Sequence, residues 1–489
     1  MALAILASGA VQAQSGPAAG QPPQPAISTT HHQVQLGQGS IAYTATVSEV
    51  MLNDLAGRPT GIGTATAYVR DGVADPAHRP VIFFFNGGPG ASSSPLHLAF
   101  GPRTVTSGAG APMTIVDNPS SLIAVADLVF IDPVGTGFSR PVDGASGAPF
   151  WSVDGDALSV AQIIRQQIAA LGRVSSPHYL FGESYGGVRA ATLLHLAPDI
   201  RFDGVLLISP ALDLSGGDPA PGNDLPYILA LPSYAAIAWR HGLGPKQAAS
   251  AEQAFEMGER FAQSDYALAL LKGDSLPASA REDIARRLSA LIGAPEPAIL
   301  QHDLRLDVET FRRALLQGKG RIIGRLDGSV TGAMEVYDKA KPPGDDPAMS
   351  GPGRPSPKLV LDRYYRTELA FPAPAAVYKT LALDVNAQWR WGFGEGGDRF
   401  YADLAPYLGE ALRRDPNLRL FAAGAIYDLA TPLGATTYAL NHAGAPTARV
   451  RIDRFVSGHM IEDDPAGLAK LRADAIAFIT ADPAPGTAP

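Results

Sequence analysis

Residues 182–186 read Gly-Glu-Ser-Tyr-Gly and place Ser184 between two glycines. They follow the apolar stretch HYLF at 178–181 and precede a predicted helix that begins near Val188. A serine on a sharp strand-to-helix turn holds its hydroxyl in the open, and glycines are needed where a side chain would clash. The Gly-x-Ser-x-Gly pattern alone also arises by chance in a glycine-rich chain. Its position between a predicted strand and a predicted helix is what makes it specific here. The sequence thus predicts Ser184 as a nucleophile.

A serine hydroxyl needs a general base, and the base needs a carboxylate to orient it. We expect both partners later in the chain, the acid before the histidine and each after a strand. His459 directly follows the strand-like residues 448–455, and Asp428 follows the apolar stretch 418–427. Alone, either residue could be a solvated loop histidine or a helix-capping aspartate. Together with Ser184 they form a predicted catalytic triad.

The stretch VIFFFNGGPGASSS at 81–94 runs from five apolar residues straight into Asn86-Gly87-Gly88-Pro89-Gly90. Attack on a carbonyl creates an oxyanion, which preorganised backbone N–H groups stabilise. One donor is the residue after the nucleophile, here Tyr185, and the other comes from a glycine-rich loop after an earlier strand. Gly88 is the predicted second donor. The alternative for this loop is a tight turn with no catalytic role.

Composition excludes several other kinds of chemistry. The net charge is −8 with no basic run, so nucleic acid and anionic membrane surfaces are not expected partners. The chain has no cysteine, which removes disulfides and thiolate catalysis. No His-Glu-x-x-His or comparable ligand cluster predicts a metal, and no Gly-x-Gly-x-x-Gly opens a helix after a strand. We therefore expect neither a metal nor a cofactor.

The order of predicted elements indicates an α/β protein with a mostly parallel central sheet covered by helices. Alternating residues between 32 and 70 predict antiparallel strands, and the later apolar runs alternate with helices. Between about 225 and 375 this rhythm gives way to long charged helices, predicted over 246–272, 280–291 and 308–317. We expect a first core part at 31–225, a largely helical cap insertion at 226–375 and a second core part at 376–482.

The first residues contain a short apolar run followed by Val11-Gln12-Ala13, the small-residue pattern that precedes signal cleavage. We therefore predict a signal peptide at 1–13, a flexible lead-in at 14–30, and a secreted or periplasmic protein. No later apolar run reaches the ~18 residues that span a bilayer.

Several segments together resemble the serine carboxypeptidase family, peptidase family S10: NGGPGASS (86–93), IDPVGTGFS (131–139), GESYGG (182–187), YDLATP (427–432) and SGHM (457–460). The resemblance implies an α/β-hydrolase fold with a helical cap. It implies a peptide substrate with a free C-terminus, from which the last residue is removed through an acyl-enzyme on Ser184. It also implies that Asn86 and Glu183 bind the substrate's terminal carboxylate, which requires a protonated carboxyl and favours acid pH.

Three departures from the family pattern concern specificity. Phe84 replaces a common Trp, Ala91 replaces a Cys, and the second Glu expected just before Gly101 is missing or moved. The triad and the oxyanion donors are unaffected, whereas strict action at the C-terminus depends on the missing acid.

The sequence leaves other functions open. An esterase, amidase or acyltransferase could use the same triad, and a binding protein with an inactive site is a rival of a different class. An intact triad argues against an inactive site, and Asn86 in place of a histidine argues against a prolyl aminopeptidase. We expect the walls of the substrate pocket to come from the insertion, and an oligomer is compatible with its exposed faces.

Overall fold

The structure, a computed structural model, describes residues 24–106, 112–217, 219–340, 344–350, 357–392 and 402–481. The predicted signal peptide at 1–13 and most of the predicted lead-in lie outside these ranges. Within them, no helix is both long enough and apolar enough to cross a lipid bilayer.

The main sheet has ten strands in the described part of the chain. Its order is β1-β2-β3-β7-β4-β9-β10-β13-β14, with β8 paired to β3. The strands from β1 to the β3–β7 pair run antiparallel, and those from β7 to β14 run parallel. The strand bounds are β1 (Ile27–Leu36), β2 (Gly39–Asn53), β3 (Pro59–Arg70), β4 (Val81–Phe85), β5 (Arg103–Thr106), β6 (Thr114–Asp117), β7 (Asp127–Asp132), β8 (Arg140–Pro141), β9 (His178–Glu183), β10 (Gly204–Ile208), β11 (Arg321–Ile323), β12 (Thr331–Ala333), β13 (Arg419–Ala425) and β14 (Val450–Phe455).

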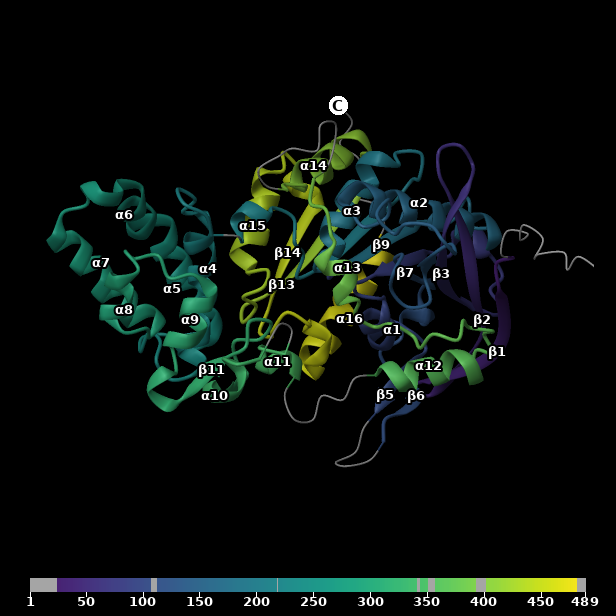
Figure 1. Cartoon of the computed structure of the whole chain (residues 1–489). Helices are drawn as coiled ribbons and strands as arrows, with labels where there is room; N and C mark the ends of the chain where they lie inside the picture. Colours follow the sequence, from purple (N-terminus) through teal and green to yellow (C-terminus); the bar gives the residue numbers. More distant parts are fainter. Residues whose placement is uncertain are drawn as a thin grey trace, which may run out of the picture.

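Helices cover both faces of this sheet, and a further group of helices stands beside it, on the left in Figure 1. The helix bounds are α1 (Ser94–Phe100), α2 (Val153–Ala170), α3 (Gly186–Leu196), α4 (Leu225–Arg240), α5 (Ala251–Phe261), α6 (Ala267–Lys272), α7 (Ala278–Ile292), α8 (Glu296–Gln301), α9 (Val308–Ala314), α10 (Met334–Tyr337), α11 (Pro347–Ser350), α12 (Lys358–Thr367), α13 (Leu383–Ala387), α14 (Ala405–Arg414), α15 (Leu433–His442) and α16 (Pro465–Thr480).

The central parallel strands are buried on both faces, which explains their continuous apolar sequences. Every residue of β4, β9 and β10 is buried. One face packs on α2, α3 and α14, and the other packs on α1, α12 and α16. The predicted α/β fold with a mostly parallel sheet is therefore confirmed.

Helices α4 to α9 share an apolar core of their own, which also includes Tyr427 and Leu429 from the loop after β13. The helix predicted without a break over 246–272 is wrong. The chain forms a helix only from α5, where the Ser250 side chain accepts from the Gln253 N–H, and a π-helical turn at Ala262–Tyr266 separates α5 from α6. A π-helical turn contains an extra residue and therefore shifts the apolar face of the helix. The regular apolar spacing used to predict helices does not reveal such a turn.

The chain returns to the sheet through α12. The hydroxyl of Tyr364 lies 3.0 Å from that of Tyr68 on β3, and the hydroxyl of Tyr365 lies 3.0 Å from that of Thr66. These tyrosines are buried against the sheet, although they lie inside the range expected for the insertion. Residues 378–390, which we call the strap and which include α13, then cross the loops that follow β4 and β7.

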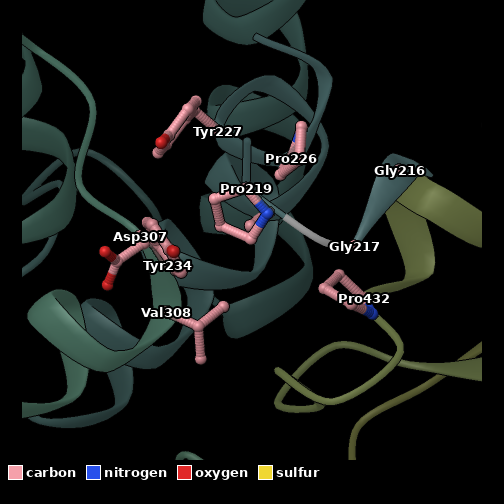
Figure 2. A pocket seen from close by; sticks show the side chains of 10 residues that line it. Gly216, Gly217, Pro219, Pro226, Tyr227, Tyr234, Asp307, Val308 and Pro432 are labelled. Carbon is pink, nitrogen blue, oxygen red and sulfur yellow. The ribbon is translucent and has the colours of Figure 1, made fainter. Parts of the chain in front are cut away.

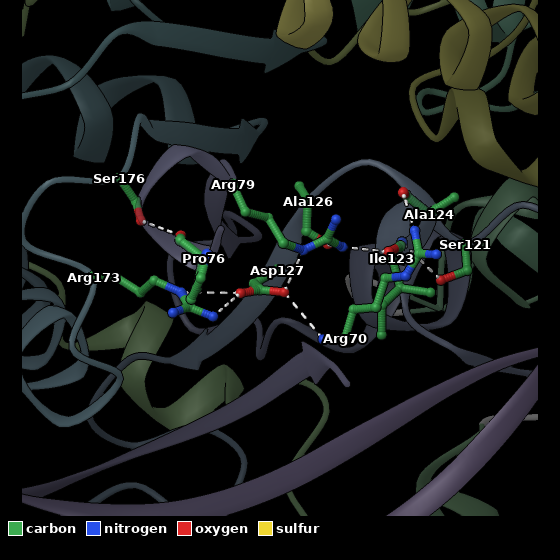
Figure 3. A network of polar contacts seen from close by, with 10 residues as sticks. All are labelled: Arg70, Pro76, Arg79, Ser121, Ile123, Ala124, Ala126, Asp127, Arg173 and Ser176. Atoms are coloured by element: carbon green, nitrogen blue, oxygen red, sulfur yellow. Dashed lines mark hydrogen bonds and ion pairs between the residues drawn. The ribbon is translucent and has the colours of Figure 1, made fainter. Parts of the chain in front are cut away.

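A buried ion network fixes the end of the sheet where β7 begins (Figure 3). One oxygen of Asp127 accepts from the Arg79 Nε at 2.7 Å and from the Arg70 N–H at 3.1 Å. The other accepts from Arg173 at 2.8 and 3.1 Å. The Asp127 side chain is completely buried, so two guanidinium groups balance one carboxylate away from the surface. This network joins three segments at the end of β7 opposite Asp132.

We predict that Asp127→Asn lowers the stability of the fold strongly. Two buried guanidinium groups would lose their counter-charge, and breaking a buried pair in this way costs about 3–5 kcal/mol. The matched control is Asp199→Asn, which breaks an exposed pair with Arg165 worth about 0–1 kcal/mol. Urea unfolding followed by circular dichroism measures both. Equal midpoints for the two variants would contradict a structural role for Asp127.

Candidate active site

Ser184 lies on the sharp turn between β9 and α3, as the sequence predicts. Its φ is +57°, a left-handed conformation that non-glycine residues rarely adopt. Backbone bonds hold this conformation: the Ser184 N–H donates to Ile208 O at 2.9 Å, and its carbonyl accepts from the Ala211 N–H at 2.9 Å. A Cβ built on Gly182 would lie 2.7 Å from the Gly186 carbonyl oxygen, so the turn leaves no room for a side chain there. The strain is typical of a nucleophile turn.

Asp428 and His459 come together as an acid–base pair. His459 Nδ1 lies 2.7 Å from Asp428 Oδ2, which fixes the proton on Nδ1 and leaves Nε2 as the proton acceptor. The other Asp428 oxygen accepts from the N–H groups of Ala430 and Thr431. Burial alone would raise the pKa of Asp428, but the His459 charge and these hydrogen bonds outweigh it and hold the pKa below its ordinary value. Asp428 is therefore ionised at neutral pH and can stabilise a protonated His459.

The end of β10 connects the nucleophile turn to the base. Ser209 follows Ile208, and its hydroxyl donates to the His459 carbonyl at 2.7 Å. Thr431 Oγ1 lies 2.8 Å from Ser209 O and 2.7 Å from Asp428 Oδ2, and its single proton can be donated to one of them at a time. Within the described residues no hydrogen bond joins the Ser184 hydroxyl to His459. Such contacts are often loose without substrate and tighten when it binds.

The glycine-rich loop after β4 lies against the nucleophile turn. A Cβ on Gly87 would overlap the Tyr185 amide nitrogen and would lie 2.9 Å from Ser184 Cβ. Gly88 has a φ of +101°, which favours glycine. Across the described ranges, the amides of Gly88 and Tyr185 donate to no protein acceptor. The loop thus meets the Ser184 turn at Gly87, and the amides of Gly88 and Tyr185 stay predicted oxyanion donors.

The strap holds this loop in place, and no motif in the sequence predicts it. The Ala382 N–H donates to Gly90 O at 2.7 Å, and Asn386 Nδ2 donates to Pro89 O at 3.1 Å. The Tyr378 hydroxyl donates to Asp132 at 2.9 Å. A segment nearly 300 residues away in the chain therefore fixes the loop from outside.

Arg189 supports the same loop from inside. It lies on α3, is completely buried, and donates to the carboxylate of Asp156 at 2.6 Å and to the carbonyl of Asn86. Its guanidinium lies 5.3 Å from the ring centre of Tyr185. A motif search does not find Arg189, because its role depends on α2 and α3 lying side by side.

Asn86 and Glu183, predicted to bind a carboxylate, are hydrogen bonded to each other. The Asn86 side-chain amide donates to Glu183 Oε2, and its oxygen accepts from the Leu96 N–H at 3.2 Å. Burial raises the pKa of Glu183 well above its ordinary value, and the neighbouring Glu462 raises it further. Glu183 therefore carries a proton at pH values where an exposed glutamate is ionised.

A loop from the helical part contacts both the acid and the base. The Leu326 carbonyl accepts from the His459 N–H at 2.6 Å, and the Gly328 N–H donates to Tyr427 O at 2.9 Å. The buried carboxylate of Asp346 accepts from the N–H groups of Arg325 and Leu326, which fixes the loop. We call residues 325–328 the anchor loop.

An open hollow with about 600 Å³ of empty space lies between the anchor loop and residues 456–464, which we call the histidine loop. Residues on its wall include Leu326, Asp327, Tyr427, His459 and Asp463. A second hollow, with about 240 Å³, lies between α4 and Pro432 and is lined by Tyr227, Tyr234 and Asp307 (Figure 2). Only the first hollow reaches a triad residue, and within the described residues no group of three or more His, Asp or Glu is placed to hold a metal.

The fold and site together define the class of protein. The predicted nucleophile follows β9, the predicted acid follows β13 and the predicted histidine base follows β14, which is the order found in the α/β-hydrolase fold. The crystal structure of a prohormone-processing carboxypeptidase from Saccharomyces cerevisiae superposes with a TM-score of 0.53 at 14% identity, over 93% of this chain and 91% of that one. This similarity confirms the predicted fold.

The sequence comparisons show similarity to one family over part of the chain. Residues 68–199 match the serine carboxypeptidase family model. Carboxypeptidase Y homolog A of Trichophyton verrucosum is 33% identical over 140 residues, which cover 27% of this chain and 24% of that protein. Carboxypeptidase Y of Saccharomyces cerevisiae is 34% identical over 116 residues, which cover 23% and 21%. The match spans about a quarter of these relatives, and it confirms the resemblance to the serine carboxypeptidase family.

We predict that a fluorophosphonate probe labels Ser184 and that Asp428→Asn slows the labelling about 10³-fold or more. An amide at 428 favours the wrong tautomer of His459, which can then no longer accept the serine proton. Peptide mass spectrometry identifies the labelled serine and the labelling rate. Asp199→Asn, far from the site on an exposed pair, should label at the wild-type rate. Labelling at another serine would refute the assigned nucleophile.

We also predict that Gly87→Ala lowers kcat for an activated ester about 10²-fold, with a smaller change in KM. The new methyl would push the loop away from the Tyr185 amide, and loss of one oxyanion donor costs about this much. Gly318→Ala is the matched control, because no atom lies within 4 Å of a Cβ built there. Equal kcat values for the two variants would show that the loop does not position a donor.

Proposed function

We propose that this protein is a serine carboxypeptidase that removes C-terminal residues from peptides through an acyl-enzyme on Ser184. The observation that carries the proposal is the Asn86–Glu183 pair directly beside the nucleophile. Glu183 precedes Ser184 in the chain, so a group bound by Glu183 lies next to the bond that Ser184 attacks. A buried carboxyl with a raised pKa is suited to bind another carboxylate, because it can donate a proton into a shared hydrogen bond.

In the proposed reaction His459 accepts the Ser184 proton as the hydroxyl attacks the peptide carbonyl. The amides of Gly88 and Tyr185 stabilise the oxyanion, and protonated His459 then gives its proton to the leaving amino group. Water, activated by the same histidine, hydrolyses the acyl-enzyme. Asp428 orients His459 through both steps.

The proposal extends to the setting of the enzyme. We infer a signal peptide at 1–13 and a secreted or periplasmic location from the small-residue pattern at Val11-Gln12-Ala13. We also infer that residues 226–375 act as a cap beside the site, since the anchor loop forms one wall of the hollow at His459.

We predict that a blocked dipeptide with a free C-terminal carboxylate is cleaved faster than its amide, and that this preference is greatest at low pH. A protonated Glu183 donates to the substrate carboxylate, whereas an ionised Glu183 repels it. Since the pKa of Glu183 is raised, the preference persists above the ordinary range of a glutamate and is lost as pH rises further. The measurement is kcat/KM for both substrates between about pH 4 and pH 8.

Ser184→Ala is the control and should abolish both reactions. Cleavage of the amide at the same rate as the acid would contradict carboxypeptidase action and point to an amidase, esterase or acyltransferase with the same triad.

A further inference from the structure

Glu462 is a buried acid that the reaction described above does not use. It lies in the short 3₁₀ turn Ile461–Asp463, three residues after His459 and outside the segments that resemble the serine carboxypeptidase family. Both of its carboxylate oxygens are buried without a hydrogen-bond partner among the described residues, although the residue as a whole is only half-buried. A buried carboxylate without a partner is costly, so such a group requires an explanation.

No N–H or O–H group donates to Glu462 in the described part of the chain, but a second carboxyl, that of Glu183, lies close enough to act on its pKa. A hydrogen bond between two carboxyl groups exists only when at least one of them carries a proton. The other charged groups that act on the pair are Asp463, Asp428 and His459. Since Asn86 already donates to one oxygen of Glu183, the other oxygen remains for the shared proton.

The helix that follows the NGGPG loop supplies no such acid. The four residues before Gly101 are His97, Leu98, Ala99 and Phe100, and none of them is an acid. His97 is the only titratable one; it is buried, and its ring lies 2.7 Å from the Tyr68 hydroxyl. Burial lowers the pKa of His97 to about 3, so it is neutral and belongs to the core. The second carboxyl at Glu183 comes instead from the histidine loop.

We infer that Glu462 is a specificity-determining residue, which shares a proton with Glu183 and thereby controls how the site binds the terminal carboxylate of a substrate. This inference rests on the proposed carboxypeptidase function and adds a residue to it.

When both carboxyls are neutral, Glu183 can donate its proton to the substrate carboxylate. When Glu462 ionises, it accepts that hydrogen bond itself and adds a negative charge beside the substrate. Burial raises the pKa of Glu462 to about 7, with Asp463 contributing in the same direction, and the first proton lost belongs to the pair as a whole. Binding of a free carboxylate should therefore weaken as pH rises through about 7.

The test is the ratio of kcat/KM for a blocked dipeptide acid to that for its amide. Ser184 and His459 act on both substrates, so the ratio isolates the carboxylate contact. For the wild-type protein we expect the ratio to fall about tenfold between pH 5 and pH 8, since one proton with a pKa near 7 is lost. For Glu462→Gln we expect a fall of less than about threefold, because the neutral amide cannot take the Glu183 proton and burial still keeps Glu183 protonated.

Asp463→Asn is the matched control. It removes one negative charge at the neighbouring position, which is exposed. Because the Asp463 charge raises the pKa of both glutamates, its removal should move the fall in the ratio slightly toward lower pH. Glu462→Gln should instead move the fall toward higher pH, because it removes the group with a pKa of about 7 and leaves only Glu183 to titrate, whose pKa is raised mainly by burial. Opposite shifts thus separate a shared proton from a simple change of charge. Glu462→Ala, equally unable to ionise, serves if the glutamine variant does not fold.

A binding experiment separates this inference from the proposed function. In the Ser184→Ala protein, calorimetry in buffers of different ionisation enthalpy measures the protons taken up with the dipeptide acid at about pH 8. We expect uptake with the acid, none with the amide, and less uptake when Glu462 is also replaced by Gln. Failure of the wild-type protein to hydrolyse either dipeptide would overturn the proposed function alone. The role of Glu462 would be overturned if Glu462→Gln left either the pH dependence of the acid-to-amide ratio or the proton uptake unchanged.

Discussion

The close approach of the Gly87 backbone to the nucleophile turn is the constraint on which the site depends. Two main-chain segments can lie this close only if neither has a side chain between them, and the overlap at Tyr185 leaves no space for a single methyl. A loop without side chains cannot hold itself in place by packing. Arg189 inside and the strap outside perform that task, each through hydrogen bonds to carbonyl groups of the loop.

The parts of the molecule that the sequence predicted are those with a local signature. The strands β4, β9 and β10 are continuous apolar runs because both of their faces are buried, and the triad residues each follow such a run. The structure brings Asp428 and His459 together, while their catalytic roles and that of Ser184 stay predictions.

The strap, the anchor loop and Glu462 left no such signature. The strap and the anchor loop act mainly through backbone groups, and Glu462 acts through a neighbour far away in the chain. Contacts of these two kinds do not require a recognisable pattern of residue types. The second carboxyl was expected before Gly101, at a fixed spacing in the chain. The acid that acts on Glu183 in the structure is Glu462, which is far from Gly101 in the sequence, so spacing along the chain does not reveal it.

The anchor loop makes the helical part and the loops of Asp428 and His459 depend on each other. Because Leu326 accepts from the backbone of His459 and Gly328 donates to the residue before Asp428, the helical part supplies backbone partners for both catalytic loops. The helical part cannot swing away as a rigid body without breaking its hydrogen bond to the His459 backbone. A graft that replaced this part would have to keep residues 325–328 and Asp346. The smallest part of this chain that could be reused with the His459 loop intact therefore includes the anchor loop as well as the sheet.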